Sequence, residues 1–427
     1  MKPHLEAMAP PSAAMRRLRV HYIRHGESQW NAAQKSARND GMDEPSVRAL
    51  ADEARFTDSP LSVQGISQAL LLRSLQQQHG EDEASSSTDG LFGLLVCASG
   101  LTCPAPSILV SNLRRAIDTC LYATRPLLDA RHEVKITVVP ALQETCHHAD
   151  CMPLPLRSDG GIEHPTASGT TSRNDSASDP ITASVLAAQA QAIETVVEAA
   201  DAQWLWEVGY SRLTLSKHAG AYDDRRRIPD GLRLRAAAEL SDPDFAEAFE
   251  PLTRRLGDVF TAAFEDIAAA RSERHPVIIT AHSRLLRELI YMFRSNRLQA
   301  TVAGIPNVAL RWDASTNSEV CASISYDTAK LNNCGFISFD IDLEVVERCT
   351  PVNGEGCRKA STLFLRHCVM GQGSVVLSRR VPSLSIAAAP SPPTRSLGNT
   401  LLFFCVLLAL AVLVVRRVRS PRRSRHD

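Results

Sequence analysis

The sequence lacks a net charge, because its 47 lysines and arginines balance its 47 aspartates and glutamates. Proteins that bind nucleic acid are usually basic, so this balance argues against a nucleic-acid partner. The chain also lacks C-x-x-C spacings, internal repeats and, near its first residue, an apolar run of signal-peptide length. Its 11 cysteines are scattered and odd in number, so we expect mostly free thiols in a reducing compartment and no disulfide framework.

The zero charge is an average over unlike parts. Residues 416–427 hold six arginines and one aspartate, which leaves 41 basic against 46 acidic residues in the rest of the chain. Residues 397–415 form an apolar run that would be about 28 Å long as a helix, close to the roughly 30 Å of a bilayer core. This run predicts a single transmembrane helix behind a Pro/Ser-rich tether.

The orientation of that helix follows from two arguments that conflict. Without a signal peptide, we expect a tail anchor that leaves the folded body in the cytosol and inserts into a mitochondrial outer, peroxisomal or endoplasmic reticulum membrane. The positive-inside rule alone would instead keep the six arginines of 416–427 in the cytosol. We favour the tail anchor, because a short tail is easier to translocate than a large body with free cysteines.

Short apolar runs alternate with helical patterns along the body of the chain. We therefore predict an α/β fold, a three-layer sandwich with a mainly parallel central sheet and helices on both faces. We expect a flexible leader at 1–16 and a main domain at 17–345, with insertions near 32–57, 80–104 and 152–184. After the main domain we expect an extension and tether at 346–396, the transmembrane helix at 397–415 and a basic tail at 416–427.

Polar residues follow four of the expected strands, at the point where each strand ends. The four segments are Arg24-His25-Gly26-Glu27-Ser28 with Asn31, Ser111-Asn112-Leu113-Arg114-Arg115, Leu142-Gln143-Glu144, and Thr280-Ala281-His282-Ser283. Because ligands of such sheets bind at the carboxyl ends of parallel strands, we expect these side chains to converge.

Two histidines, two arginines and a carboxylate suit phosphoryl transfer. Guanidinium groups bind the oxygens of a phosphoryl group in pairs and stay charged. A neutral imidazole can attack phosphorus and form a phosphohistidine, and a carboxylic acid can supply the proton that the leaving alkoxide needs. Because the cationic side chains stabilise the transition state, this chemistry needs no metal and no cofactor.

The four segments, in this order, resemble the motifs of the histidine phosphatase superfamily, the phosphoglycerate-mutase-like group. Asp58-Ser59-Pro60-Leu61 with Gly65, and Asn333-Cys334-Gly335, resemble further segments of that family. The resemblance implies a nucleophilic His25, a phosphate pocket of Arg24, Arg115 and His282, Glu144 as general acid and later base, Asn31 as a phosphate or substrate contact, and Gly26 as the residue that lets the backbone approach the nucleophile.

The resemblance therefore implies a metal-independent phosphoric monoester hydrolase. The segment between Asn31 and Asp58 lacks the tryptophan- and asparagine-containing stretch expected of phosphoglycerate mutases, which disfavours a mutase. A phosphomutase and a catalytically silent scaffold that binds phosphorylated partners remain alternatives. The substrate stays open between phosphorylated small molecules, lipids and phosphoproteins.

Three other groups of residues invite a functional interpretation that we do not favour. Arg114 points about 100° away from Arg115 on a helix, so we expect a solvated surface arginine. The cluster Cys146, His147, His148, Asp150 and Cys151 does not have the spacing of a structural zinc site. Residues 225–227 are three arginines, and such a run is usually a solvated face.

Overall fold

The computed structural model describes residues 16–82, 105–144, 148–154, 180–216, 241–267, 275–324, 329–348, 358–371, 374 and 376–378. The chain divides into two units, 1–379 and 380–427. The second unit, with most of the predicted tether, the predicted transmembrane helix 397–415 and the tail 416–427, lies outside the described residues, as do most of the leader and of the insertions 80–104 and 152–184. Among the described residues, no helix is long and apolar enough to cross a membrane.

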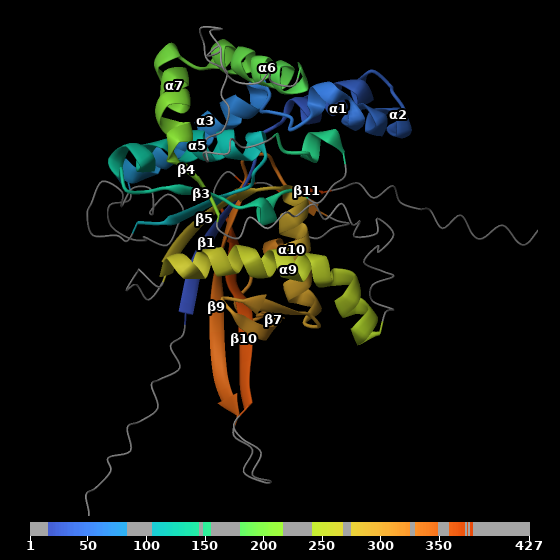
Figure 1. Ribbon diagram of the computed structural model, residues 1–427, viewed down its shortest axis with the longest axis vertical. Coiled ribbons are helices and arrows are strands. Elements are labelled where there is room, and N and C mark those ends of the chain that lie inside the picture. The colour runs from blue at the N-terminus through green and yellow to red at the C-terminus, as the bar shows by residue number, and fades with distance from the viewer. Residues whose placement is uncertain are drawn as a thin grey trace, which may run out of the picture. The chain divides into compact units, whose positions relative to one another are not determined.

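A nine-stranded sheet forms the centre of the first unit (Figure 1). Its order is β4-β3-β2-β5-β1-β9-β10-β7-β6. The strands are β1 (Arg16–Arg24), β2 (Ser107–Val110), β3 (Ile136–Val138), β4 (Leu213–Leu215), β5 (His275–Ala281), β6 (Gln299–Val302), β7 (Ile305–Trp312), β9 (Phe336–Arg348) and β10 (Arg358–Met370). A separate pair is made by β8 (Ala329–Leu331) and β11 (Val376–Ser378).

Helices cover both faces of this sheet. They are α1 (Gln29–Asn39), α2 (Glu44–Ala49), α3 (Val63–Asp82), α5 (Arg114–Ala130), α6 (Pro180–Val196), α7 (Ala199–Trp204), α9 (Asp242–Ile267), α10 (Ser283–Ser295) and α11 (Glu319–Ser323). Short helical turns lie at Leu50–Asp52, Ala54–Phe56, Pro140–Leu142, Ala149–Cys151, Leu205–Gly209 and Tyr210–Arg212.

Side chains of β1 point alternately to the two faces of the sheet, so this strand contributes to the hydrophobic core on each face. Leu18, Val20 and Tyr22 pack on the side of α9 and α10, whereas Ile23 packs on the side of α3 and α5 (Figure 1). The predicted α/β sandwich with helices on both faces is therefore found.

The sheet is mixed: five of its eight strand pairings are parallel, in keeping with the predicted mainly parallel sheet, and the other three are antiparallel. β1 pairs in parallel with β5 but antiparallel with β9, and β9 pairs antiparallel with β10. Cross-strand ion pairs accompany this antiparallel part, because Arg17 and Arg19 of β1 lie opposite Asp342 and Asp340 of β9. The sheet also extends to Met370, so the main domain does not end at residue 345 as predicted.

Four neighbouring strands carry the motifs. In the order β3-β2-β5-β1 they are parallel to one another, as expected. Their carboxyl ends lie along one edge. β2, β5 and β1 lead directly into Ser111, His282 and His25. β3 leads to Glu144 through the helical turn Pro140–Leu142. The topology therefore gathers segments that are far apart in the sequence.

Candidate active site

His25 follows the last residue of β1 and is buried. Its backbone N–H donates to Ala281 O (3.0 Å), which ties it to the end of β5, and its Nδ1 lies 2.6 Å from Gly26 O. A carbonyl oxygen only accepts, so Nδ1 carries the proton and Nε2 of the neutral ring keeps its lone pair. Burial, and then the charges of Arg115 and Arg24, lower the pKa of His25 well below its ordinary value. Both observations favour a neutral ring whose Nε2 lone pair is available.

Close backbone packing explains the glycine next to the nucleophile. A Cβ on Gly26 would lie 2.6 Å from Gly65 O, and a Cβ on Gly65 would lie 2.0 Å from Glu27 O. Neither position admits a side chain unless the loop moves. The glycines at positions 26 and 65 therefore reflect this contact between the loop after β1 and the first turn of α3.

His282 is the N-cap residue of α10 and is fully buried. Tyr22 holds its backbone, because the Tyr22 hydroxyl donates to His282 O (2.9 Å) and accepts from His282 N–H (3.2 Å). The ring Nε2 lies 2.8 Å from Ser111 Oγ. Burial, and then Arg115, lower the pKa of His282 well below its usual value. This imidazole is therefore neutral as well.

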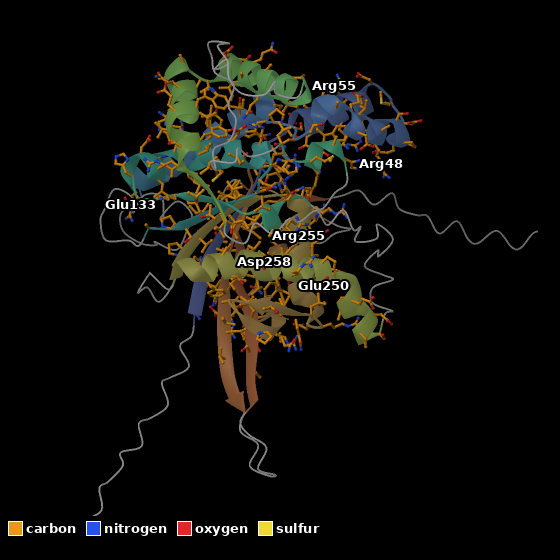
Figure 2. The ribbon with its side chains drawn as sticks, viewed as in Figure 1. Arg48, Arg55, Glu133, Glu250, Arg255 and Asp258 are labelled. Atoms are coloured by element: carbon orange, nitrogen blue, oxygen red, sulfur yellow. A yellow bond between two sulfur atoms is a disulfide. The ribbon has the colours of Figure 1, made fainter. Side chains whose placement is uncertain are left out.

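Glu144 approaches His282 from the end of β3. Its Oε2 lies 3.9 Å from His282 Nδ1, and its side chain is 15% exposed, so the carboxyl group meets both the pocket and solvent. Gln143 holds this loop through two hydrogen bonds. Its side-chain Nε2 donates to Cys151 O (2.7 Å). Its backbone carbonyl accepts from Nη2 of Arg255 on α9 (2.8 Å), a residue labelled in Figure 2. The predicted acid therefore stands on a fixed segment.

Two buried arginines complete the site. Arg24 Nη1 donates to Leu331 O (2.5 Å), and burial lowers the pKa of Arg24 to about 10. Arg115 lies in the first turn of α5, where Nη1 donates to Asp150 O (2.5 Å) and Nη2 lies 3.7 Å from Asp150 Oδ2. Both guanidinium groups are positioned before any ligand arrives.

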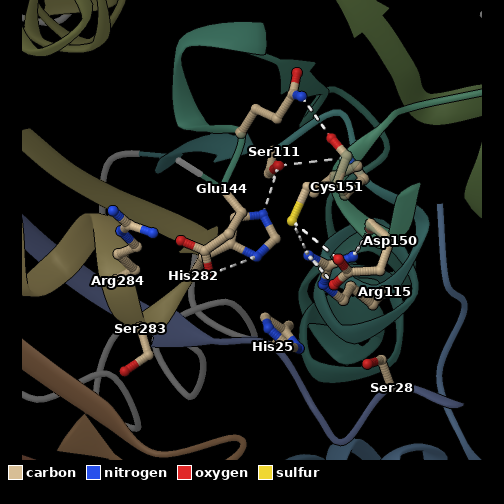
Figure 3. A network of polar contacts seen from close by, with 12 residues as sticks. His25, Ser28, Ser111, Arg115, Glu144, Asp150, Cys151, His282, Ser283 and Arg284 are labelled. Atoms are coloured by element: carbon tan, nitrogen blue, oxygen red, sulfur yellow. Dashed lines mark hydrogen bonds and ion pairs between the residues drawn. The ribbon is translucent and has the colours of Figure 1, made fainter. Parts of the chain in front are cut away.

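These side chains face one space. Figure 3 shows His25, Glu144, His282 and Arg115 around it, and the ring centroids of the two histidines are 5.0 Å apart. Arg24 Nε and His282 Nδ1 are buried and make no hydrogen bond within the part of the chain that the structure describes. Buried donors are rarely left without a partner, so a bound anion fits this space.

The same space contains the only described group that has metal-ligand spacing. Ligand atoms of His25, Glu144 and His282 all lie within 4.8 Å of one another. The guanidinium groups of Arg24 and Arg115 add positive charge beside them, which disfavours a divalent cation and favours a phosphate. The side chains present fit an anion better than a metal.

The Cys/His cluster near residue 150 does not gather around one point. Asp150 pairs with Arg115, and the exposed His148 lies 3.2 Å from Asp52. Cys146 and His147 lie outside the described residues. Among the described members, Asp150 and Cys151 contact Arg115, and His148 contacts Asp52 instead.

Arg114 is buried, which is a correction to its predicted place on the surface. Only 2% of its side chain is exposed. Its backbone N–H donates to Asp58 Oδ1 (2.9 Å), its Nη1 donates to Gln189 Oε1 (3.2 Å), and its Nε lies 3.6 Å from Asp58 Oδ2. The helical argument that Arg114 points away from Arg115 is sound, but α6 covers that side too. The sequence gives no sign that α6 packs there.

Asn31 has a structural role at the start of α1. Its N–H donates to Ser28 Oγ (3.1 Å), and its Oδ1 accepts from Ser28 N–H (3.4 Å), which is a reciprocal capping box. A contact between Asn31 and substrate stays a prediction.

Among the described cysteines, the expectation of mostly free thiols does not hold. Cys321 and Cys368 form a disulfide, and Cys151 is also disulfide-bonded. Of the described cysteines, only Cys120 and Cys334 are free, and both are buried. The spacing of Cys321 and Cys368 gives no hint of this bond, because it depends on α11 packing against β10.

Sequence reasoning also missed Thr119, which contacts both Arg115 and Gly26. Its Oγ1 donates to Arg115 O (2.6 Å) and accepts from Gly26 N–H (3.0 Å). The sequence offered one sign of this role: Thr119 comes one helical turn after Arg115 and therefore lies on the same face of the helix.

Among known proteins, only solved structures resemble this chain in the comparisons. No family model matches the chain, and no curated protein matches it. A phosphoglycerate mutase from Bacillus anthracis str. Sterne has 13% identity and a TM-score of 0.29, covering 77% of this chain and 90% of the other. The ecdysone phosphate phosphatase from Bombix mori has 14% identity and a TM-score of 0.28, covering 80% and 97%. A Bifidobacterium longum multiple inositol polyphosphate phosphatase has 11% identity and a TM-score of 0.29, covering 88% and 90%.

These proteins are members of the histidine phosphatase superfamily, which is the family that the four motifs resemble. Their identities and TM-scores are low, so they support no inference about the substrate or reaction of this chain. The chain resembles the superfamily in the order of its motifs.

Proposed function

We propose that this protein hydrolyses phosphomonoesters through a phosphohistidine on His25, without a metal. The observation that carries the proposal is the 2.6 Å contact between His25 Nδ1 and Gly26 O, in a pocket that also holds a second neutral imidazole and two guanidinium groups. The contact leaves Nε2 as a nucleophile, and the cationic groups would bind the phosphoryl oxygens.

The first step transfers the phosphoryl group to the enzyme. The Nε2 lone pair of His25 attacks phosphorus, the N–P bond forms, and the P–O bond to the leaving group breaks. Protonated Glu144 gives its proton to the leaving oxygen, so the product is a neutral alcohol. Arg24, Arg115 and the His282 N–H stabilise the negative charge on the equatorial oxygens.

The second step releases phosphate. Glu144, now ionised, takes a proton from a water molecule as that water attacks phosphorus. The P–O bond forms, the N–P bond breaks, and its electron pair returns to Nε2. Glu144 is protonated again, so the cycle closes without an oxidant or a co-reactant.

The deciding experiment measures hydrolysis of p-nitrophenyl phosphate by the full chain in excess EDTA. We expect turnover by the wild type, an acid-labile phosphoryl group trapped on His25, and no turnover by His25→Asn. The exposed His132 supplies the matched control, His132→Asn, which should keep wild-type activity. Unchanged turnover in His25→Asn would refute the phosphohistidine mechanism.

The two alternatives give different results in the same assay. A phosphomutase would transfer the phosphoryl group between substrate positions and would depend on a bisphosphate primer. A silent scaffold would bind inorganic phosphate or vanadate but would never label His25. The proximity of Glu144 to His282 favours the hydrolase over the scaffold, because a binding pocket has no need of a general acid.

The substrate that fits is a phosphorylated small molecule or a phosphoprotein. A substrate panel on the full chain, with sugar, inositol, lipid and protein phosphates, would rank these classes by kcat/KM. A nucleic-acid partner is not part of the proposal, given the zero net charge of the sequence.

The membrane anchor at 397–415 is a separate proposal that the sequence alone supports. Deleting 397–427 should release the protein from membranes; a truncated protein that still sediments with vesicles would contradict it. The orientation with the body in the cytosol is opposed by the Cys321–Cys368 disulfide, since such bonds are rare there. Protease protection in intact membranes would decide between the two orientations.

A further inference from the structure

Thr119 of α5 makes two hydrogen bonds through one oxygen. The side chain is fully buried. Its hydroxyl donates to Arg115 O (2.6 Å), one turn earlier in its own helix, and the same oxygen accepts from Gly26 N–H (3.0 Å) in the nucleophile loop. The hydroxyl therefore joins the turn of α5 that carries Arg115 to the residue beside His25.

Gly26 is held on both sides as a result. Its N–H donates to Thr119, and its carbonyl accepts from His25 Nδ1 (2.6 Å). A glycine is required there by the close contact with Gly65, yet a glycine has more backbone freedom than any other residue. The Gly26 carbonyl belongs to the peptide unit whose Glu27 N–H donates to Gln68 Oε1 (2.9 Å), and the Gly26 N–H that Thr119 binds belongs to the preceding unit. Loss of the Thr119 bond would free this preceding unit, so the backbone of Gly26 could turn and weaken the contact of its carbonyl with the imidazole.

We propose that Thr119 is a positioning residue for the nucleophile: through Gly26 it keeps the proton of His25 on Nδ1 and the lone pair on Nε2. This inference rests on the proposed function of His25, and it adds a residue that never touches the substrate. It also fixes the nucleophile relative to Arg115, because one hydroxyl binds both segments.

The same helix contains a matched control. Thr124 is also fully buried, and its hydroxyl donates to Cys120 O (2.7 Å), the same bond to its own helix that Thr119 makes. Within the described chain, Thr124 makes no hydrogen bond to the nucleophile loop. A valine at either position removes a hydroxyl and keeps the shape, but only the change at position 119 releases Gly26.

The experiment compares Thr119→Val, Thr119→Ser and Thr124→Val in the full chain. We expect Thr119→Val to slow phosphorylation of His25 by p-nitrophenyl phosphate about tenfold, while the inhibition constant of vanadate changes less than about twofold, as expected when the phosphate pocket is intact. Thr119→Ser, which restores the hydroxyl, should return to within about twofold of the wild type. Thr124→Val should keep the wild-type rate even if its melting temperature falls as much as that of Thr119→Val.

A second readout does not depend on turnover. The imidazole ¹⁵N resonances of His25 should show the Nδ1–H form alone in the wild type and a mixture of both neutral forms in Thr119→Val. Wild-type resonances and rate in Thr119→Val, or equal rate losses in the two valine variants, would overturn the positioning role. A wild-type protein with no turnover but with the expected resonance change would overturn the proposed function and leave the positioning role standing.

Discussion

The ring centroids of His25 and His282 lie 5.0 Å apart, although the two residues follow β1 and β5, which are far apart in the sequence. Parallel pairing of β1 with β5 causes this meeting, because Arg24 lies opposite Ala281 in the register and each histidine comes one residue later. Burial keeps both rings neutral, and the neighbouring arginines reinforce that effect. The sheet therefore brings two neutral imidazoles to one pocket.

Glu144→Gln tests the general acid. Glu144 also acts as the base of the second step, which is the same for every substrate, so the test uses kcat/KM, which reports the first step alone. The loss in kcat/KM should be about 100- to 10,000-fold for an alkyl phosphate, whose alkoxide needs a proton, and much less for p-nitrophenyl phosphate, whose phenolate leaves without one. Steady-state kinetics with both substrates measures the difference. Glu133→Gln, at an exposed carboxylate labelled in Figure 2, is the control and should change neither rate. Equal losses for the two substrates would exclude acid catalysis by Glu144.

Residue patterns predicted much of the sheet edge that carries the site. The apolar alternation of 18–22 and the short run 108–110 mark buried strands, and the polar residues that follow them mark the edge. Such local patterns report on strand and helix positions because burial repeats with a fixed period.

Long-range packing was not predictable from the same patterns. Whether Arg114 faces solvent depends on where α6 docks, and the segment before α6 has no periodic signal. The Cys321–Cys368 bond and the hydroxyl bridge of Thr119 likewise depend on contacts between elements that no local pattern encodes.

The buried His21 makes stability depend on pH. Burial lowers its pKa from 6.5 to about 3, so below pH 6.5 the unfolded chain binds a proton that the folded chain does not. The free energy of unfolding should therefore fall with decreasing pH, with a slope from this residue that approaches about 1.4 kcal/mol per unit, or about 2 kcal/mol between pH 6.5 and 4.5.

Urea unfolding of the wild type and of His21→Asn across that range tests this dependence. The variant should lose less stability on acidification, because His25 and His282 contribute equally to both proteins. Exposed His132→Asn should show the wild-type slope. Parallel slopes for the wild type and His21→Asn would contradict the assignment.

The Cys321–Cys368 disulfide should stabilise the catalytic unit. It closes a loop with a sequence separation of 47, and loop-closure entropy for that length amounts to about 4 kcal/mol as an upper figure. Replacing both residues with alanine should lower the free energy of unfolding by about 2–4 kcal/mol under oxidising conditions. Dithiothreitol should lower the melting temperature of the wild type more than that of the double variant. Equal effects of dithiothreitol on the two proteins would show that this bond does not form.

The ion pair between Arg114 and Asp58 should matter far more than an exposed pair of similar geometry. Both partners are about 2% exposed, and burial raises the pKa of Asp58, so removal of the guanidinium leaves a carboxyl group in the interior without its cation. Arg114→Met should destabilise the protein by about 3–5 kcal/mol, because the loss of one partner of a buried pair leaves an uncompensated charge.

Arg38 supplies the matched comparison. It pairs with Glu44 at 2.8 Å, but the two side chains are 46% and 52% exposed, so water screens the pair. Arg38→Met should change the stability by less than about 1 kcal/mol. Chemical unfolding of both variants measures the contrast. If Arg114→Met were as stable as Arg38→Met, then Arg114 would lie at the surface, as its sequence context first suggested, and the packing of α6 against α5 through Gln189 would be wrong.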